Sequence, residues 1–552
     1  MNNLPREGIN ELGATWQGAR PPENFEASQS PPEPVPPAEL AAVRPVAVID
    51  IGATSIRMTI AEIHPNGSIR ALDTLVQAVE LGREAFTNRR ISRPTIERSA
   101  SILRKFQRVL REYGIRSAAN IRVVATSAVR EAVNRLAFID RVFIATGLVV
   151  EVIDEAEVNR ITYMGINPNL EQDLELQKAR CVVVEVGGGS TELLVMRNGN
   201  MILSDTFRLG SLRLVEMLQS ATSTASRRRS LMEHQIGRII DRVSETLETQ
   251  IDTRLIAIGG DVRFAARQIL GHWDTETLAE IPTEKLVELT DDILRLDEDG
   301  VVKKYATSYI EAETLGPALL TYQRLAQHFG LKTILISNTN LRDGLLHDMA
   351  LGGSWTSAFR NLIVRSAIAL GRKCEIDEDH ALQTAWLASE LFAQLNREHR
   401  LPERFEVILH VAAILYQIGL FINLRSSHKH SMYLIRNSEL FGLSKNDLLL
   451  VGLVARYHRR SSPQPTHEGY ASLPREDRVV VSKLAAILRV AIALDEARSG
   501  RVRHFRCARE GKRMVIELTG IEDNSMEQLA LRQNGLLFEE VYGIPVMLRS
   551  RR

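Results

Sequence analysis

Two glycine turns with acidic and hydroxyl-bearing neighbours are the residues of this sequence best suited to chemistry. The first reads Asp-Ile-Gly-Ala-Thr-Ser over residues 50–55, and the second reads Glu-Val-Gly-Gly-Gly-Ser-Thr-Glu over residues 185–192. Backbone N–H groups in successive turn residues can donate hydrogen bonds to phosphate oxygens. A pair of such turns therefore indicates that a phosphate chain is held from two sides.

Each turn lies between apolar runs typical of β-strands. Val46–Ile49 precedes the first turn and Cys181–Val184 precedes the second, and the run that follows each turn ends at Asn66-Gly67 and at Asn198-Gly199. Asn-Gly is a strong hairpin signal, because both central residues of a type I′ turn need a positive φ. The repeat predicts two halves that face one another across a cleft, each built as strand, glycine turn, strand, Asn-Gly turn and strand.

Composition places the chain among ordinary soluble globular proteins. Its 552 residues are 44% hydrophobic and 25% charged, with a formal net charge of +1, which argues against general coating of nucleic acid or membrane. Its three cysteines are far apart in the sequence and have no metal-ligand spacing. No apolar run approaches the roughly 18 residues of a membrane span, and the first residues lack an apolar signal core. We expect a cytoplasmic protein without specific nucleic-acid or membrane partners.

The pattern along the chain predicts an arm followed by four folded parts. Prolines among polar residues predict a disordered arm. Alternating strand and helix patterns then predict two similar halves. A change to amphipathic helices, followed by renewed strand alternation, predicts two smaller parts. The expected limits are 1–43, 44–175, 176–352, 353–500 and 501–552. Helices are expected near 94–113, 226–250 and 308–329, and strands near 148–153, 255–258, 333–336 and 514–518.

The two turns, together with motifs between and after them, resemble the Ppx/GppA family of exopolyphosphatases and guanosine pentaphosphate phosphohydrolases. Residues 50–55 are similar to its first phosphate loop, D-x-G-S-N-S, and residues 186–192 to its second, D-I-G-G-G-S-T-E. Residues 126–132 resemble its T-x-x-x-R-x-A segment, residues 258–263 its G-G-T-x-R turn, and residues 337–344 its S-x-x-x-L-R-x-G segment.

Further motifs extend the resemblance toward the end of the chain. Tyr457-His458-Arg459 is similar to the family's R-Y-H-R, residues 428–435 to its H-K-H-S-A-Y-L-I, and residues 537–543 to the tail of its long members. The resemblance implies an α/β fold with duplicated actin-like (ribonuclease H-like) domains, a C-terminal all-α HD-type domain and a small α/β tail.

The resemblance also implies roles for the residues of the turns. Phosphate would be bound by Gly52, Ala53, Thr54, Ser55, Gly187, Gly188, Gly189, Ser190 and Thr191. Mg²⁺ would be held by Asp50, Glu185 and Glu192, since this ion prefers carboxylate, water and phosphate oxygens. Arg130 would neutralise charge on the transferred phosphoryl group, so that the reaction would be hydrolysis of a terminal phosphoanhydride by an in-line water.

Several positions depart from the family pattern. Where the family has E-E-A-R, with its second glutamate assigned to water activation, this chain has Glu157-Val158-Asn159-Arg160. Glu157 is the carboxylate left to act as base, but adjacent helical residues point about 100° apart, so this role needs a shifted helix or water. Loss of a general base typically costs about 10²- to 10⁴-fold in rate.

Other departures fall at a predicted cation ligand, at the predicted phosphate-binding surface and in the helical part. Glu185 replaces an aspartate, Thr54 an asparagine and Asp261 a threonine of the family pattern. Where HD-type proteins have adjacent histidine and acidic ligands, this chain has Tyr416-Gln417, although His380 and Asp495 occupy flanking ligand positions. Two ligands of four make a poor metal site.

The leading prediction is an Mg²⁺-dependent hydrolase that releases orthophosphate from the ends of inorganic polyphosphate. The first alternative is removal of the 5′-phosphate of guanosine pentaphosphate, and the second is a catalytically weakened sensor that binds polyphosphate or nucleotide. An actin-like sugar or acetate kinase is a further alternative, disfavoured by the helical part and tail. Members of this family often form dimers, and Leu420–Ile422 is a candidate homodimer contact, although such a run is more often core.

Overall fold

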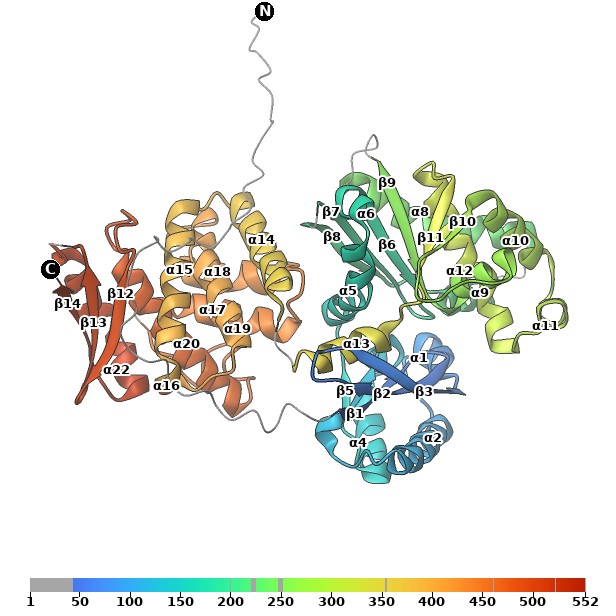
Figure 1. Cartoon of the computed structure of the whole chain (residues 1–552), viewed down its shortest axis with the longest axis horizontal. Helices are drawn as coiled ribbons and strands as arrows, with labels where there is room; N and C mark the ends of the chain where they lie inside the picture. The colour runs from blue at the N-terminus through green and yellow to red at the C-terminus, as the bar shows by residue number, and fades with distance from the viewer. Residues whose placement is uncertain are drawn as a thin grey trace, which may run out of the picture. The chain divides into compact units, whose positions relative to one another are not determined.

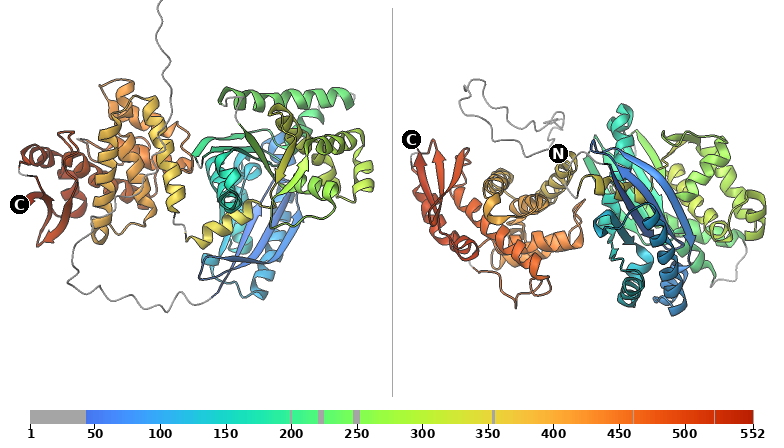
Figure 2. Two further views of the ribbon diagram at one scale, coloured as in Figure 1. Left: turned by 45° about the horizontal axis from the view of Figure 1, so that its top comes forward. Right: turned by 60° about the horizontal axis from the view of Figure 1, so that its bottom comes forward.

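The computed structural model describes residues 43–198, 200–219, 225–246, 252–352, 355–459, 461–521 and 523–551. Almost all of the expected Pro-rich arm, Gly199 of the second Asn-Gly turn and the end of the helix expected near 226–250 lie outside the described residues. Figures 1 and 2 show two sheet-and-helix lobes, a helical region and a small C-terminal sheet.

The first sheet contains the first glycine turn at one end of its central hairpin. Its strand order is β3-β2-β1-β4-β5, with β1 and β2 antiparallel, β2 and β3 antiparallel, and β4 and β5 added in parallel. The strands are β1 (Arg44–Ile51), β2 (Ser55–Ile63), β3 (Ile69–Ala78), β4 (Ile121–Ala125) and β5 (Val150–Val152).

Alternation along β1 divides the core of this lobe between two helical layers. Ala47 and Ile49 pack with residues of α2 (Arg93–Glu112) and α4 (Arg135–Thr146). Val46 and Val48 pack instead with residues of α5 (Glu155–Gln172) and α13 (Leu341–Ala350). Successive strand side chains point to opposite faces, so β1 is covered on both sides. The lobe also contains α1 (Leu81–Asn88), η1 (Ala118–Asn120) and α3 (Ser127–Glu131).

The second sheet repeats the hairpin unit of the first. Its order is β10-β11-β9-β6-β7-β8, and β9 lies parallel to β6 as β4 lies parallel to β1. The strands are β6 (Arg180–Val186), β7 (Thr191–Arg197), β8 (Asn200–Phe207), β9 (Thr253–Ile258), β10 (Ala279–Pro282) and β11 (Thr333–Ile336). The predicted repeat is therefore present, with one extra antiparallel strand, β10, at the edge.

The helices of this lobe are α6 (Leu174–Lys178), α7 (Ser211–Gln219), α8 (Ala225–Thr246), α9 (Gly260–Leu270), α10 (Thr283–Arg295), α11 (Glu298–Tyr305) and α12 (Tyr309–His328). Two of them, α8 and α12, correspond to the ranges predicted near 226–250 and 308–329. A capping box opens α12: the Ser308 hydroxyl accepts from the Glu311 N–H, and the Glu311 carboxylate accepts from the Ser308 N–H. This reciprocal pair explains why the helix begins there.

Residues after 355 form helices and then a small sheet. The helices are α14 (Ser357–Lys373), α15 (Glu378–Gln394), α16 (Asn396–His399), α17 (Arg404–Leu415), η2 (Ile418–Phe421), α18 (Ser427–Arg436), α19 (Lys445–Arg456) and α20 (Arg475–Leu494). The tail contains β12 (Phe505–Glu510), β13 (Arg513–Thr519), α21 (Ser525–Asn534), α22 (Leu536–Tyr542) and β14 (Val546–Arg551). The predicted change from helices to a small α/β tail is present.

One helical stretch among the described residues, Arg404–Phe421, is long and apolar enough to cross a membrane by length and composition. The sequence predicts no run of this length, and the structure differs because the helix Arg404–Leu415 continues into the short helix η2. Because 67% of this stretch is buried inside the structure, it has the character of a core helix, and the feature is weak support for a membrane span.

Candidate functional site

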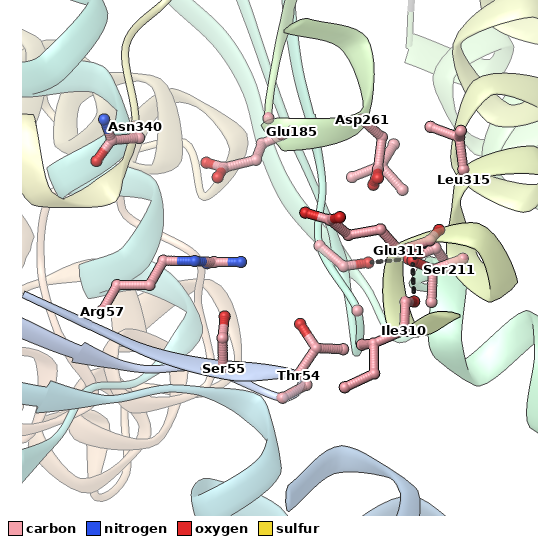
Figure 3. A pocket seen from close by; sticks show the side chains of 18 of the residues that line it. Thr54, Ser55, Arg57, Glu185, Ser211, Asp261, Ile310, Glu311, Leu315 and Asn340 are labelled. Carbon is pink, nitrogen blue, oxygen red and sulfur yellow. Dashed lines mark hydrogen bonds between the residues drawn. The ribbon is translucent and has the colours of Figure 1, made fainter. Parts of the chain in front are cut away.

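A cleft of about 700 Å³ lies between the two sheets at the ends that carry the glycine turns. Figure 3 shows side chains from both lobes around it, with Thr54 and Ser55 on one side and Glu185 on the other. All but two of the predicted site residues line this cleft: Asp50, Gly52, Ala53, Thr54, Ser55, Arg130, Glu185, Gly187, Gly188, Gly189, Ser190 and Glu192. The exceptions are Glu157 and Thr191.

The two glycine turns have the same internal hydrogen bond. The Gly52 N–H donates to the Ser55 carbonyl at 3.0 Å, and the Gly187 N–H donates to the Ser190 carbonyl at 2.9 Å. In each case the turn joins the first two strands of its sheet. The repeat seen in the sequence is thus a repeat of backbone geometry, and both copies open onto the same cleft.

Close packing explains the glycines of the second turn. A Cβ atom on Gly189 would lie 2.4 Å from both the Phe86 ring and the Ser127 hydroxyl, and one on Gly188 would lie 3.2 Å from the Ala53 side chain. The two turns are therefore almost in van der Waals contact. The sequence predicts glycines here because phosphate would come close to the backbone. The structure adds a second reason: side chains of the first lobe also pack closely against these residues.

The carbonyl groups of the second turn are occupied by the segment that follows β8. The Ser211 N–H donates to Gly187 at 2.9 Å, and the Arg213 N–H donates to Gly188 at 3.1 Å. The Arg213 side chain donates to the Gly189 carbonyl at 2.9 Å. Among the described residues, no acceptor takes the N–H groups of Gly188 and Gly189. The turn is thus fixed through its acceptors while these donors remain available for an anion.

Asp50 lies at the end of β1 and is almost completely buried. One carboxylate oxygen, Oδ2, lies 3.6 Å from the Arg57 guanidinium and 3.8 Å from that of Arg342. The other, Oδ1, has no hydrogen-bond partner among the described residues, and neither does the buried hydroxyl of Ser55. Buried polar atoms are normally satisfied, so two such atoms in one cleft point to a ligand.

Glu185 and Glu192 are cross-strand neighbours on β6 and β7. Burial raises the pKa of Glu185, and the nearby Asp50 carboxylate adds to this effect. Burial and the charge of Glu185 raise the pKa of Glu192 to about 7, although the Ser190 hydroxyl donates to Glu192 at 2.5 Å. These carboxyl groups are close enough to repel one another, so a cation between them and the substrate would relieve the repulsion.

The carboxylates fit a magnesium ion that shares its ligands with phosphate and water. Among the described residues, no three Asp, Glu, His or Cys side chains lie close enough to bind one ion by themselves. Mg²⁺ is usually held by one or two carboxylates together with substrate phosphates and waters. The unpartnered Oδ1 of Asp50 and the nearby Glu185 supply such a pair, whereas the structure gives Glu192 no separate reason to be a ligand.

Arg130 lies in the last turn of the short helix α3 and lines the cleft. Its guanidinium donates to the Ile153 carbonyl at 2.9 Å and lies 3.8 Å from the Glu155 carboxylate. The carbonyl bond orients a charged group that is only weakly paired. Arg130 therefore lies in the cleft, and its role in neutralising phosphate stays a prediction.

The structure places Glu157 outside the cleft. Its carboxylate accepts from the Arg160 guanidinium at 2.7 and 2.8 Å, and Arg122 lies 3.4 Å away. Val158, the next residue of α5, lines the cleft instead. The prediction of Glu157 as the base therefore needs correction: the rotation of about 100° per helical residue turns it toward an ion-pair network.

Thr191 is the second predicted residue that does not line the cleft. Its side chain is fully buried, and its hydroxyl donates to the Leu209 carbonyl at 2.5 Å. The Thr191 side chain thus holds the segment after β8 against the turn and does not face the place where phosphate would lie.

Sequence reasoning did not assign several charged residues that line the cleft. Arg57, Arg263 and Arg342 contribute guanidinium groups, and Glu311 contributes a carboxylate. Arg57 follows the first turn by two residues, which is a signal because β2 alternation places it on the face of Ser55. Arg263 and Arg342 stood in recognised motifs without an assigned role, and the sequence around Glu311 indicated only a helix.

The helical region has no metal cluster among its described residues. His380 is bonded through Nδ1 to Asp495 at 2.7 Å and through Nε2 to the Tyr416 hydroxyl at 2.6 Å, and all three side chains are buried. The phenol of Tyr416 satisfies the ring nitrogen that would otherwise be available to a metal. The tyrosine at position 416 therefore completes a buried hydrogen-bonded chain of Asp495, His380 and Tyr416.

The chain is similar to known proteins over most of its length. The guanosine-5′-triphosphate,3′-diphosphate pyrophosphatase of Aeromonas hydrophila is 24% identical over 502 residues, covering 89% of this chain and 95% of the relative. The protein of the same name from Aliivibrio fischeri is 24% identical over 452 residues, covering 80% and 86%. The crystal structure of an exopolyphosphatase from Cytophaga hutchinsonii has a TM-score of 0.51 at 21% identity, covering 56% of this chain and 98% of that one, a likeness that shows the fold.

Family descriptions match most of the described chain. The Ppx/GppA phosphatase family matches residues 59–352, and domain III of the Ppx/GppA phosphatases matches residues 363–540. The chain belongs to the Ppx/GppA phosphatase family.

Proposed function

We propose that this protein hydrolyses a terminal phosphoanhydride and releases orthophosphate. The observation that carries the proposal is the pair of matched turns on one cleft, next to two buried polar atoms without partners, Asp50 Oδ1 and the Ser55 hydroxyl. Phosphoryl transfer depends mainly on positioning and on neutralising charge. A cleft with backbone donors and arginines is suited to both tasks.

The chain's own groups would act on the phosphate as follows. The free N–H groups of Gly188 and Gly189 would bind oxygens of the terminal phosphate, and the Arg130 guanidinium would neutralise charge that develops in the transition state. Asp50 and Glu185 would hold Mg²⁺, which would supply positive charge that neutralises the phosphate. Arg57 and Arg342 lie beside Oδ2 of Asp50 and would orient this carboxylate with its free oxygen toward the ion.

Two substrates fit this reaction. Inorganic polyphosphate is the first, and the exopolyphosphatase name of the structural neighbour agrees with it. Guanosine pentaphosphate is the second, and it is supported by relatives that align over most of their length. Both present a terminal phosphoanhydride, so the turns alone do not choose between them.

A second candidate function is binding with little turnover. It is favoured by Val158, which places an apolar side chain in the cleft, and by Glu157, which is held in ion pairs elsewhere. A protein with this arrangement would bind polyphosphate or nucleotide and act as a sensor.

We extend the proposal to the organisation of the chain. The limits 44–175 and 176–352 would delimit two actin-like domains, 353–500 an HD-type domain that has lost its metal, and 501–552 the tail. A cytoplasmic location and a homodimer are further parts of the proposal. The dimer contact would be Leu420–Ile422, whose side chains are exposed.

The test is orthophosphate release with Mg²⁺ from long-chain polyphosphate and from guanosine pentaphosphate. Arg130→Ala and Gly188→Asp are the disabled controls. The first removes the guanidinium group from the cleft, and the second adds a carboxylate to the second glycine turn. Native release well above both controls supports hydrolysis. Tight binding of either compound with release no higher than in the controls supports the sensor instead, and neither binding nor release would overturn both proposals.

A further inference from the structure

Arg213, in the first turn of α7, contacts the second glycine turn from behind the cleft. Its guanidinium donates from Nε to the Gly189 carbonyl at 2.9 Å and from Nη2 to the Glu131 carboxylate at 2.7 Å. Its Cζ also lies 4.1 Å from the centroid of the Phe86 ring. The side chain is only 17% exposed, so these neighbours replace most of the water around its charge.

These three partners come from both lobes. Gly189 belongs to the turn before β7, whereas Phe86 lies in α1 and Glu131 is the last residue of α3. Arg130, which lines the cleft, directly precedes Glu131. The Arg213 side chain therefore ties the second glycine turn to the short helix that holds Arg130.

The start of α7 donates to three successive carbonyls of this turn, those of residues 187–189. The first accepts from the Ser211 N–H at 2.9 Å, the second from the Arg213 N–H at 3.1 Å and the third from the Arg213 guanidinium at 2.9 Å. Figure 3 shows Ser211 beside the cleft. Only the third of these bonds has a charged donor, and such bonds are roughly twice as strong as neutral ones.

A hydrogen bond to a carbonyl also acts on the N–H at the other end of the same peptide group. Bonds in series polarise one another, so donation to the Gly189 carbonyl makes the Ser190 N–H a stronger donor. Within the described ranges no acceptor takes this N–H, as is also the case for Gly188 and Gly189. The charge of Arg213 therefore reaches the side of the turn where an anion would bind, although Arg213 itself does not line the cleft.

We propose, on the basis of the function proposed above, that Arg213 is a positioning residue for phosphoryl transfer. It polarises the second glycine turn through the Gly189 carbonyl, and through Glu131 it fixes Arg130 relative to that turn. Because Arg130 would act on charge that develops in the transition state, loss of Arg213 affects the transition state more than the bound ground state. A displacement of about 1 Å can cost about 10²-fold in rate.

The first test compares binding of orthovanadate and inorganic phosphate to the full chain with Mg²⁺. Orthovanadate can take up the five-coordinate arrangement of a phosphoryl group during in-line transfer, and transition-state analogues bind more tightly than ground-state ligands. Arg213→Met removes the guanidinium and keeps an unbranched side chain. Its affinity for orthovanadate should fall about tenfold more than its affinity for phosphate.

The second test measures kcat and KM for orthophosphate release from polyphosphate and from guanosine pentaphosphate. In Arg213→Met, kcat should fall about tenfold or more while KM changes little, which is the pattern of an interaction made in the transition state. Arg213→Lys keeps the charge without the fork of donors, so it should restore only part of kcat.

Arg83→Met is the matched control. Arg83 also joins the two lobes, since it extends from α1 to the Glu313 carboxylate of α12 at 2.6 and 2.8 Å, but none of its contacts is with the turn. This variant should be less stable in thermal unfolding, with kcat and the ratio of the two affinities unchanged.

An unchanged ratio in folded Arg213→Met, or the same change in Arg83→Met, would overturn the inference, because Arg213 would then be a structural link only. A native protein that binds neither anion would overturn it as well. If Arg213→Met does not fold, Glu131→Gln decides by the same ratio. Absence of orthophosphate release by the native protein would instead reject the proposed hydrolysis, and the binding ratio would still decide the role of Arg213.

Discussion

Glu157 and Val158 are adjacent in α5, yet only the Val158 side chain lines the cleft, while the Glu157 carboxylate is bound by Arg160 at 2.7 and 2.8 Å. The helix therefore presents an apolar group at the place from which the resembled family is expected to activate water. The consequence is that α5 contributes no carboxylate to the cleft at this position.

Val158→Glu should increase turnover. The new carboxylate would enter the cleft from α5, and a positioned general base is typically worth about 10²- to 10⁴-fold. The measurement is kcat for orthophosphate release with Mg²⁺, with Val158→Gln as a control of equal size without a base. Equal rates in the two variants would contradict the assignment of this position to water activation.

Glu157→Gln should lower stability and leave catalysis unchanged. Arg160 is buried and shares its charge between Glu157 and Asp348, so loss of one partner should cost about 1–3 kcal/mol. Urea unfolding measures this cost, and Glu378→Gln, which breaks a more exposed pair with Arg372, should cost less than about 1 kcal/mol. A large fall in kcat of the folded Glu157→Gln protein would return Glu157 to the list of catalytic residues.

Gly189→Ala should destabilise the protein through contacts and not through backbone strain. The added methyl group would meet Phe86 and Ser127 at 2.4 Å, and overpacking of this kind costs about 1–3 kcal/mol. Gly237→Ala in α8, where a Cβ atom has no neighbour within 4 Å, should instead stabilise by up to about 1 kcal/mol. Thermal unfolding of both variants checks the difference, and equal effects would refute the packing argument.

The pH dependence of stability should change in Glu192→Gln. Burial and Glu185 raise the pKa of Glu192 to about 7, above the value of about 4.3 for an unfolded glutamate. Between these values the folded state binds more protons than the unfolded state, so stability of the metal-free protein falls as pH rises. Between pH 4.5 and pH 7, the free energy of unfolding of the native protein should fall by up to about 3 kcal/mol relative to that of Glu192→Gln.

Urea unfolding with a chelator at several pH values measures this difference. The sign is the reverse of the usual carboxylate case, because the folded state favours the protonated form. A difference that stays constant with pH, or one that grows in favour of the native protein, would show that Glu192 titrates normally.

Tyr416→Phe should destabilise the helical region. The Tyr416 hydroxyl bonds to His380 Nε2 at 2.6 Å in a buried position, and an unsatisfied buried partner costs about 1–3 kcal/mol. Tyr433→Phe, at an exposed position of α18, should change stability by less than about 0.5 kcal/mol. Equal stability of the two variants would mean that His380 does not depend on the phenol.

Much of the phosphate cradle could be predicted because its signals are local. Strand alternation, the glycines of residues 185–192 and the repeat of the hairpin unit all lie within short stretches of sequence, and the structure gives both turns the same hydrogen bond. The rotation of Glu157 away from Val158 also followed from helical geometry. The pair of Glu157 with Arg160 is local, at i,i+3 on the same helix, but the link to Arg122 could not be predicted, since Arg122 comes from another element.

Residues brought together only by tertiary structure escaped prediction. Arg342 reaches Asp50 across nearly 300 positions of sequence, where it also donates to Thr59 at 2.9 Å. The edge strand β10 has only four residues and ends at a proline, which is a weak strand signal. Long-range pairing and short edge strands leave little trace in a single sequence.

The near contact between the two turns limits how the duplicated halves can change over evolutionary time. Because a Cβ atom on Gly188 would lie 3.2 Å from the Ala53 side chain, a larger residue in either copy would take space from the other. The two positions should therefore vary together. A larger residue at one should be accompanied by a smaller residue at the other, even where the rest of the two halves has diverged.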